Sequence, residues 1–164
     1  MGCFQSKETE NDNVVTENCF YNNQSDVSES ISWKDTKPFV VPITTGRVIK
    51  VYDGDTITVA NTLPIHNCND IFRFSVRLNG IDCPEIRGKS DEEKQAAQLS
   101  KTVLYDLVMN KVVELKNVST EKYGRLLADV YIGEIHVNSW MIDNNYAIPY
   151  DGKTKISQEF KTSF

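Results

Sequence analysis

Residues 46–60 read "GRVIKVYDGDTITVA", and this stretch decides how the folded part of the chain is expected to begin. Two short runs rich in β-branched residues, at about 46–52 and 56–60, flank the tripeptide Asp53-Gly54-Asp55. Asp-Gly between such runs is a strong signal for a β-hairpin. The stretch therefore predicts two antiparallel strands joined by a tight acidic turn.

Beyond this hairpin, the chain predicts a third strand and then a helix. Residues 71–81 ("IFRFSVRLNGI") alternate apolar and polar side chains, which is typical of a strand with one polar face. Residues 90–110 instead repeat apolar side chains at the spacing of a helix. Ser90 and Glu93 form the S-x-x-E pattern of a capping box, so the helix is expected to begin there.

The rest of the chain predicts further strands and a second helix. The expected elements are a fourth and a fifth strand, a short sixth strand and a short helix, at residues 111–118, 125–132, 135–137 and 137–147. Three strands, a helix and two strands is the order of a five-stranded oligonucleotide- and oligosaccharide-binding barrel, the OB fold. We therefore expect a mainly β protein of the α+β class, a five-stranded OB-fold barrel with two to three helices.

The acidity of the chain is concentrated at its beginning. The formal net charge is −5 over 164 residues, and residues 1–36 hold seven acidic side chains against two lysines. A segment so rich in Asn, Ser and acidic residues buries too little apolar surface to offset its ordering entropy. We therefore expect a disordered acidic tail over residues 1–36 and a folded domain over 37–164, which is neutral overall.

The cysteines and the short apolar runs favour a reduced, intracellular context. The four cysteines form no CxxC pair, the two histidines are isolated, and no apolar run reaches the length of a membrane span or a secretory signal. A zinc site is therefore not expected, and a cytoplasmic location is expected unless a lipid anchor is added.

The first six residues, "MGCFQS", match the pattern for such an anchor. Gly2 is placed for myristoylation after removal of Met1, and Cys3 beside it is placed for palmitoylation. One myristoyl chain binds membranes only marginally, so two acyl chains together make a stable anchor. The expectation is a protein held at the cytoplasmic face of a membrane, although an ordinary initiator segment would read the same way.

Polar residues gather where the predicted strands turn, and their chemistry suits a phosphodiester. Asp55 and Asp82, from different strands, can share a calcium ion, to which the backbone carbonyl of Cys83 can add a third oxygen. A calcium ion beside a phosphate polarises it. Arg77 and Arg125 can clamp the phosphate oxygens, and Glu85 is then left to take a proton from an attacking water.

Each of these residues also has a plainer interpretation. Asp53 and Asp55 can be turn residues, Arg77 and Asp82 can be a surface ion pair, and Lys122-Tyr123-Gly124 can be an ordinary hairpin turn. An EF-hand loop is excluded, because Ile57 stands where a third ligand is needed.

Three segments together resemble the staphylococcal nuclease (thermonuclease) family: "VYDGDTITV", "RLNGIDCPE" and "EKYGRLLADVYI". The resemblance covers roughly residues 44–150. It implies that Asp55, Asp82 and the carbonyl of Cys83 bind calcium, with Asp53 supporting the site from outside the ligand set. It also implies that Glu85 is the general base and that Arg77 and Arg125 bind phosphate.

The resemblance carries further expectations for substrate and product. Lys122 and Tyr123 match positions that contact a terminal phosphate of a bound nucleotide, and Tyr150 is a closer match than Tyr146 for a tyrosine near the base. Family members hydrolyse DNA and RNA with weak sequence preference, favour single strands and leave 3′-phosphate ends. Only about fourteen residues follow Tyr150, so the third helix of the family's domain is expected to be short or missing.

The expected function is therefore a calcium-dependent, monomeric nuclease tethered to a membrane surface. The alternatives are a catalytically silent OB-fold module that binds nucleic acid or protein, and a membrane-tethered adaptor in which the acylated tail matters most.

Overall fold

The computed structural model describes residues 30–63, 69–88, 90–121 and 123–152. The chain divides into two compact units, Met1–Thr36 and Lys37–Phe164. The described part of the first unit contains a short 3-10 helix, η1 (Trp33–Asp35). The expected disorder of the tail over residues 1–36 falls mostly on residues outside the described parts, and the described residues 30–36 include η1. The acylation of Gly2 and Cys3 and the short or missing third helix concern residues outside the described parts, so they stay predictions.

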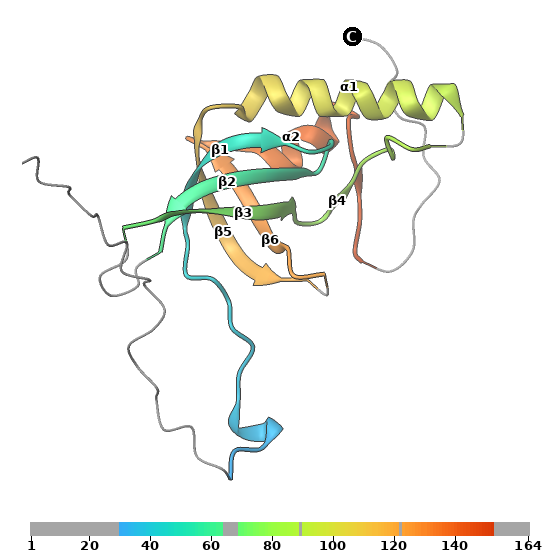
Figure 1. The fold of residues 1–164 in the computed structure, drawn as a ribbon. Helices are drawn as coiled ribbons and strands as arrows, with labels where there is room; N and C mark the ends of the chain where they lie inside the picture. The colour runs from blue at the N-terminus through green and yellow to red at the C-terminus, as the bar shows by residue number, and fades with distance from the viewer. Residues whose placement is uncertain (1–29, 64–68, 89, 122, 153–164) are drawn as a thin grey trace, which may run out of the picture. The chain divides into compact units, whose positions relative to one another are not determined.

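The second unit is built on a five-stranded barrel. Its strands are β1 (Thr45–Val51), β2 (Thr56–Thr62), β3 (Ile71–Leu78), β5 (Val112–Thr120) and β6 (Leu126–Ile132). Antiparallel pairing gives the order β3-β2-β1-β5-β6, and parallel pairing of β3 with β6 closes the barrel (Figure 1). The short strand β7 (Ile135–His136) extends the sheet beside β6.

Two α-helices and a small second sheet accompany the barrel in the described residues of this unit. Helix α1 (Asp91–Val108) lies across the barrel near β1, and α2 (Val137–Asp143) follows β7 (Figure 1). Strands β4 (Ile81–Asp82) and β8 (Ile148–Pro149) pair with each other. The predicted mainly β, five-stranded OB-fold barrel of the α+β class is therefore confirmed, and the described residues hold two of the two to three helices expected.

The core forms from the inward faces of the strands and one side of α1. Val59, Val76 and Leu78 are fully buried in the barrel, as are Leu104 and Val108 of α1. The helix begins as predicted, since the N–H of Glu93 donates to Ser90 Oγ at 3.1 Å. Burial of these apolar side chains is the main stabilising term of the unit.

Strand β1 contains an irregularity that the sequence pattern does not reveal. Its register with β2 pairs Val48 with Val59 and Lys50 with Thr58, so Ile49 is an extra residue, a β-bulge. Inward-facing positions therefore pass from Val48 to Val51, and both are buried, whereas Lys50 is exposed. Without the bulge, strict alternation would turn Lys50 into the barrel.

Asn138 ties α2 to the barrel through a buried side chain. Its Oδ1 accepts from the N–H of Val130 at 2.9 Å, and its Nδ2 donates to the carbonyls of Asn79 at 2.8 Å and Ala128 at 3.2 Å. Its residue surface is 2% exposed. Because these partners lie in β6 and in the turn after β3, Asn138 fixes the helix against the place where the barrel closes.

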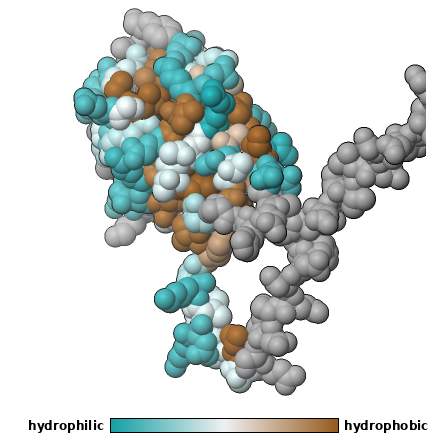
Figure 2. Space-filling view, turned by 90° about the vertical axis from the view of Figure 1, so that its left-hand side faces the viewer, coloured by the Kyte–Doolittle hydropathy of each residue, from teal (hydrophilic) through white to brown (hydrophobic). Residues whose placement is uncertain are grey.

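The outer surface carries both polar and apolar side chains. Hydrophobic and hydrophilic residues are interspersed over the face shown in Figure 2. Several large apolar side chains of described residues are exposed, among them Phe39, Ile71 and Val112. Exposed apolar residues of this kind are normal for folded domains. Among the helices of the described segments, none has the length and apolarity needed to cross a membrane.

Candidate active site

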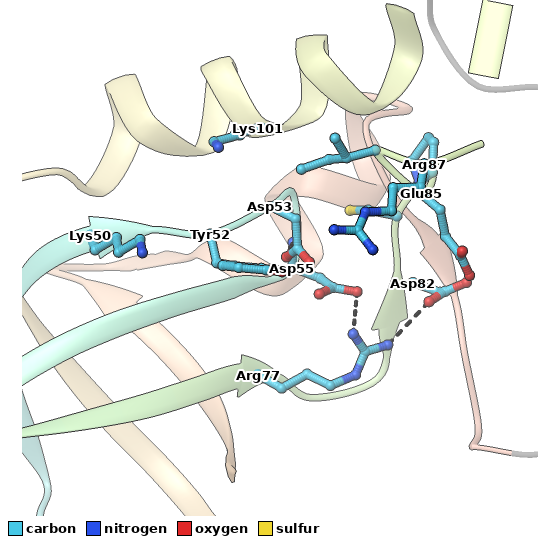
Figure 3. Close-up of a pocket in the computed structure, with 12 residues that line it drawn as sticks. Lys50, Tyr52, Asp53, Asp55, Arg77, Asp82, Glu85, Arg87 and Lys101 are labelled. Atoms are coloured by element: carbon cyan, nitrogen blue, oxygen red, sulfur yellow. Dashed lines mark hydrogen bonds and ion pairs between the residues drawn. The ribbon is translucent and has the colours of Figure 1, made fainter. Parts of the chain in front are cut away.

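A cavity of about 590 Å³ lies between the β1–β2 turn, the end of β3, the loop after β4 and helix α1 (Figure 3). Its lining combines four acidic and four basic side chains with apolar ones. The charged residues are Lys50, Asp53, Asp55, Arg77, Asp82, Glu85, Arg87 and Lys101. Elements that are far apart in the sequence therefore bring most of the predicted site residues to one place.

Arg77 lines this cavity and connects two of its carboxylates. The β2–β3 ladder pairs Arg77 with Thr56, which sets the arginine beside the β1–β2 turn. Its Nη1 pairs with Asp55 Oδ2, and its Nη2 lies 3.1 Å from Asp82 Oδ1 and donates to the carbonyl of Ile81 (Figure 3). The Asp55 and Asp82 side chains are 7% and 11% exposed, so this is a buried ion network and not a surface ion pair.

Burial makes the charge of Asp55 costly. The pKa of Asp55 is raised to about 6, first by burial of its carboxyl and then by repulsion from Asp53. Attraction from Arg77 and the hydrogen bond from Thr56 Oγ1, at 2.8 Å, act in the opposite direction and lower the pKa. A carboxylate in this state gains from any additional positive charge placed beside it.

The Asp-Gly-Asp turn is packed tightly against its surroundings. Asp53 Oδ1 accepts from the N–H of Asp55 at 3.2 Å, so the turn interpretation of Asp53 holds together with its place in the cavity. A Cβ on Gly54 would lie 2.8 Å from Cys83 Sγ and 2.8 Å from Ser100 Cβ. Glycine is therefore needed here for close approach of the turn to α1.

Cys83 has a packing role in addition to its backbone carbonyl. Its side chain is buried, and burial raises the pKa of the thiol well above its ordinary value, with smaller contributions from nearby carboxylates. The thiol donates to the carbonyl of Tyr146 at 3.5 Å. Cys83 is thus held as a thiol, which makes it a poor nucleophile.

Glu85 lines the same cavity as Arg77, and Tyr150 contacts Arg77 through its ring. Glu85 is exposed and lines the cavity on the same side as Asp82 (Figure 3). Tyr150, half-buried, has its ring centroid 6.0 Å from Arg77 Cζ, a distance at which a cation–π contact forms. Tyr146 is buried and stacks on Trp140, so of the two tyrosines considered, Tyr150 is the one in contact with Arg77.

Two further predicted residues that the structure describes, Tyr123 and Arg125, do not line the cavity, and neither does Tyr150. Arg125 pairs with Glu121 across a short turn, and Tyr123 at the tip of that turn is exposed. The parallel β3–β6 ladder pairs Val76 with Leu126 and Arg77 with Leu127, so Arg125 precedes the first pair of this ladder, two positions before the partner of Arg77. Lys122 lies outside the residues that the structure describes.

The lining also contains residues that sequence reasoning missed: Lys50, Tyr52, Arg87 and Lys101. Arg87 follows Glu85 by two residues and could have been noted from that proximity. Lys50 and Tyr52 face the cavity because of the bulge at Ile49, and Lys101 because α1 packs beside β1. Neither cause leaves a local signal in the sequence.

The carboxylates of the cavity suit a hard cation only in part. Asp55 and Asp82 converge on one guanidinium, so both already face a common point of positive charge. Within the described residues, no group of three or more His, Cys, Asp or Glu side chains is placed to hold a metal ion. A calcium ion here would therefore take two carboxylates and complete its oxygen ligands from backbone carbonyls and water, which calcium accepts.

Comparison with known proteins identifies the family. Residues 75–163, more than half of the chain, match the family model described as "Staphylococcal nuclease homologue". A Haemophilus influenzae protein named "Uncharacterized endonuclease" is 36% identical over 106 residues, which cover 65% of this chain and 52% of that protein.

Two further relatives have similar names. An "Uncharacterized endonuclease" of Escherichia coli O157:H7 is 30% identical over 107 residues, covering 65% of this chain and 61% of its own. "Endonuclease Htp3" of Saprolegnia parasitica is 27% identical over 116 residues, covering 64% and 55%. The chain spans between 52% and 61% of the length of these relatives. From the family match and the shared barrel, we conclude that the chain belongs to the family of staphylococcal nuclease homologues.

Proposed function

We propose that this chain is a nuclease that hydrolyses phosphodiester bonds of DNA and RNA. The observation that carries the proposal is Arg77, held between the buried carboxylates of Asp55 and Asp82 on the wall of an open cavity. Family membership and the names of the relatives support the same reaction class.

Calcium is the proposed cofactor. Asp55, Asp82 and the backbone carbonyl of Cys83 would hold it, and Asp53 would support Asp55 through the hydrogen bond within the turn. When bound, calcium would polarise the phosphate and offset charge that develops on it. The convergence of the Asp55 and Asp82 carboxylates on Arg77 supports this assignment, because it brings two oxygen ligands to one place.

The protein's own residues supply the remaining steps. The Arg77 guanidinium donates one N–H group to Asp55 and another to Asp82. The same two N–H groups have the geometry to bind two oxygens of one phosphate. Glu85 Oε accepts one proton from the attacking water, whose oxygen bonds to phosphorus as the bond between phosphorus and the 5′ oxygen breaks. The 5′ oxygen takes a proton from solvent and leaves as a hydroxyl, and the phosphate stays on the 3′ end. Arg125, two positions before the β6 partner of Arg77, is the proposed second phosphate ligand once it exchanges Glu121 for the substrate.

The proposed substrate is a single strand, read with little sequence preference. The cavity offers four basic side chains and the exposed ring of Tyr52, groups that can bind the backbone and bases of any sequence. We propose that the chain acts as a monomer, because all of these groups come from one chain. Lys122 and Tyr123 are proposed to contact a terminal phosphate of the bound strand, and Tyr150 to lie beside a base.

Release of acid-soluble nucleotides from single-stranded DNA tests the proposal, measured with calcium and with a chelator. Glu85→Gln removes the base without a change of size, and general-base catalysis contributes about 10²–10⁴-fold, so the rate is expected to fall by that factor. Glu134→Gln, the same change at an exposed glutamate outside the cavity lining, is the matched control. Equal rates in calcium and chelator, or full activity in Glu85→Gln, would refute the mechanism.

We also propose that the chain is tethered at the cytoplasmic face of a membrane by acyl chains on Gly2 and Cys3. The support is the sequence pattern at residues 1–6 and the need for two weak anchors to make one stable one. Gly2→Ala is expected to shift the full chain from membrane to soluble fractions, and Cys3→Ser to shift it in part. An unchanged distribution of both variants would contradict the tether.

A further inference from the structure

We propose that the cavity contains a second nucleotide subsite, made by Lys50, Tyr52 and Lys101, for the nucleotide next to the cleaved phosphodiester. The proposal rests on the proposed nuclease function and makes it more specific. It implies a substrate of at least two linked nucleotides in single-stranded form, with one phosphate at Arg77 and the next at the two lysines.

The three residues share one end of the cavity. In Figure 3, Lys50 and Tyr52 project from β1 and Lys101 from α1 above them, while Glu85 and Arg87 lie on the other side of the Asp53–Asp55 turn. All five side chains line the same cavity. A strand bound at Arg77 can therefore continue past the acidic turn toward β1.

The charges at this end suit a phosphate. Arg77 shares its charge with Asp55 and Asp82, whereas none of the carboxylates in the described part of the chain forms an ion pair with Lys50 or Lys101. Phosphate contacts from lysines supply sequence-independent affinity for nucleic acid. The folded domain is neutral overall, so its affinity for a nucleic-acid backbone depends on local concentrations of positive charge. Lys50 and Lys101 provide such a concentration at this end of the cavity.

Tyr52 adds a surface for a base. It is 58% exposed, so its burial contributes little to the fold, and Lys50 Nζ lies 5.9 Å from its ring centroid. Single-strand binding sites combine exposed aromatic rings with neighbouring cations, because every base has a face on which a ring can stack. Tyr52 and Lys50 form such a pair at the mouth of the cavity.

The backbone is arranged to present these side chains. The bulge at Ile49 moves Lys50 and Tyr52 to the outer face of β1 and returns Val51 to the core. Bulges are over-represented next to active sites, where they re-aim side chains. The cavity volume of about 590 Å³ lies within the range of about 300–1,000 Å³ that encloses drug-sized ligands, so it holds more than one phosphate group.

Two measurements on the full chain test the subsite. The first is the affinity for a fluorescein-labelled single-stranded oligothymidylate in chelator, followed by anisotropy over a series of salt concentrations. The second is kcat and KM for the same oligonucleotide with calcium. Tyr52→Ala is expected to weaken binding by about 5-fold to 150-fold, the effect of losing one base stack, and to raise KM much more than it lowers kcat.

The lysine variants have a different signature. Lys50→Gln and Lys101→Gln are each expected to lower the slope of log affinity against log salt by about 0.7, the value for one phosphate contact on a single strand. Tyr52→Phe keeps the ring and is expected to bind as the wild type does. Phe39→Ala and Lys94→Gln remove an exposed ring and an exposed charge outside the cavity, as matched controls.

The outcomes separate the subsite from the nuclease proposal. If the wild type cleaves and the Tyr52 and lysine variants match their controls in affinity and salt slope, the subsite is wrong and the nuclease proposal stands. If the wild type does not cleave, the nuclease proposal fails, and the binding measurement in chelator still decides the subsite. An oligonucleotide that does not bind the wild type, or equal effects of Tyr52→Ala and Phe39→Ala, would overturn the subsite.

Discussion

Substitution of Asp55 by Asn should stabilise the calcium-free protein at neutral pH. The pKa of Asp55 is raised from 3.8 to about 6, a value that already includes the attraction of Arg77. Each pKa unit corresponds to about 1.4 kcal/mol, so the charged carboxylate costs about 3 kcal/mol of the free energy of unfolding at pH 7. Asn has a similar size and carries no charge, so Asp55→Asn removes this cost, while Asp82 remains as the partner of Arg77.

The raised folded-state pKa of Asp55 determines how the stabilisation by Asp55→Asn depends on pH. Because the folded-state pKa of Asp55 lies above the unfolded value, its stabilising contribution is complete below pH 3.8 and is lost as the pH rises through 6. The stability difference between Asp55→Asn and the wild type should therefore grow from pH 4 to pH 7. It should level off above that pH.

Urea denaturation in chelator, followed by tryptophan fluorescence between pH 4 and pH 8, measures this difference. Asp106→Asn, an exposed carboxylate on α1, is the control and should show little pH-dependent change. Calcium should reduce the difference in free energy of unfolding between Asp55→Asn and the wild type. A calcium concentration of 100 times the dissociation constant adds about 2.7 kcal/mol to the free energy of unfolding of the wild type. A difference that is constant across this pH range, or one that favours the wild type most at pH 8, would refute the reasoning.

Two further substitutions test how the site is supported. Gly54→Ala places a methyl group 2.8 Å from Cys83 Sγ and Ser100 Cβ, and should lower the free energy of unfolding by about 1–3 kcal/mol; a neutral result would show that the turn can shift. Asn138→Ala leaves the buried N–H of Val130 and two carbonyls without this partner, and should cost about 3 kcal/mol or more in the same denaturation assay, whereas a loss below 1 kcal/mol would mean that the neighbours repair the contacts.

The barrel could be predicted from the sequence because its signals are local. The Asp-Gly turn between β-branched runs predicted the β1–β2 hairpin, and the change from a two-residue to a helical period before Ser90 predicted α1. These patterns depend on residues a few positions apart, so one sequence is enough to show them. The short pairing of β4 with β8 was not predicted, because it joins positions 81–82 to 148–149.

The candidate site was predicted in part, and the parts differ in physical origin. Asp55, Arg77 and Asp82 were expected to act together and are joined in one ion network. Arg125 was expected to lie opposite Arg77 across a bound phosphate. In the structure it forms an ion pair with Glu121, a carboxylate only four residues away in the sequence. Ion-pair choice depends on which side chains meet in space, and the sequence pattern does not contain that information.

Lys50, Tyr52 and Lys101 show a second limit. Alternation along β1 would assign Lys50 to the interior, and only the extra residue at Ile49 places it outside. The residue types around the bulge do not reveal it, since Val48, Ile49 and Val51 all favour regular strands. Which residues of β1 face α1 therefore became clear only from the structure.

The parallel ladder between β3 and β6 has a consequence for the time course of folding. It joins Val76 to Leu126, so the chain must close a long loop before this pairing forms. Contacts between residues distant in sequence are slow to form because the entropy of loop closure is lost before the contact stabilises the chain. A nascent or partly folded chain can form the β1–β2–β3 meander early, but Arg125 reaches the neighbourhood of Arg77 only when the last ladder closes. A chain that unfolds transiently at this ladder would separate the two arginines before the rest of the barrel is lost.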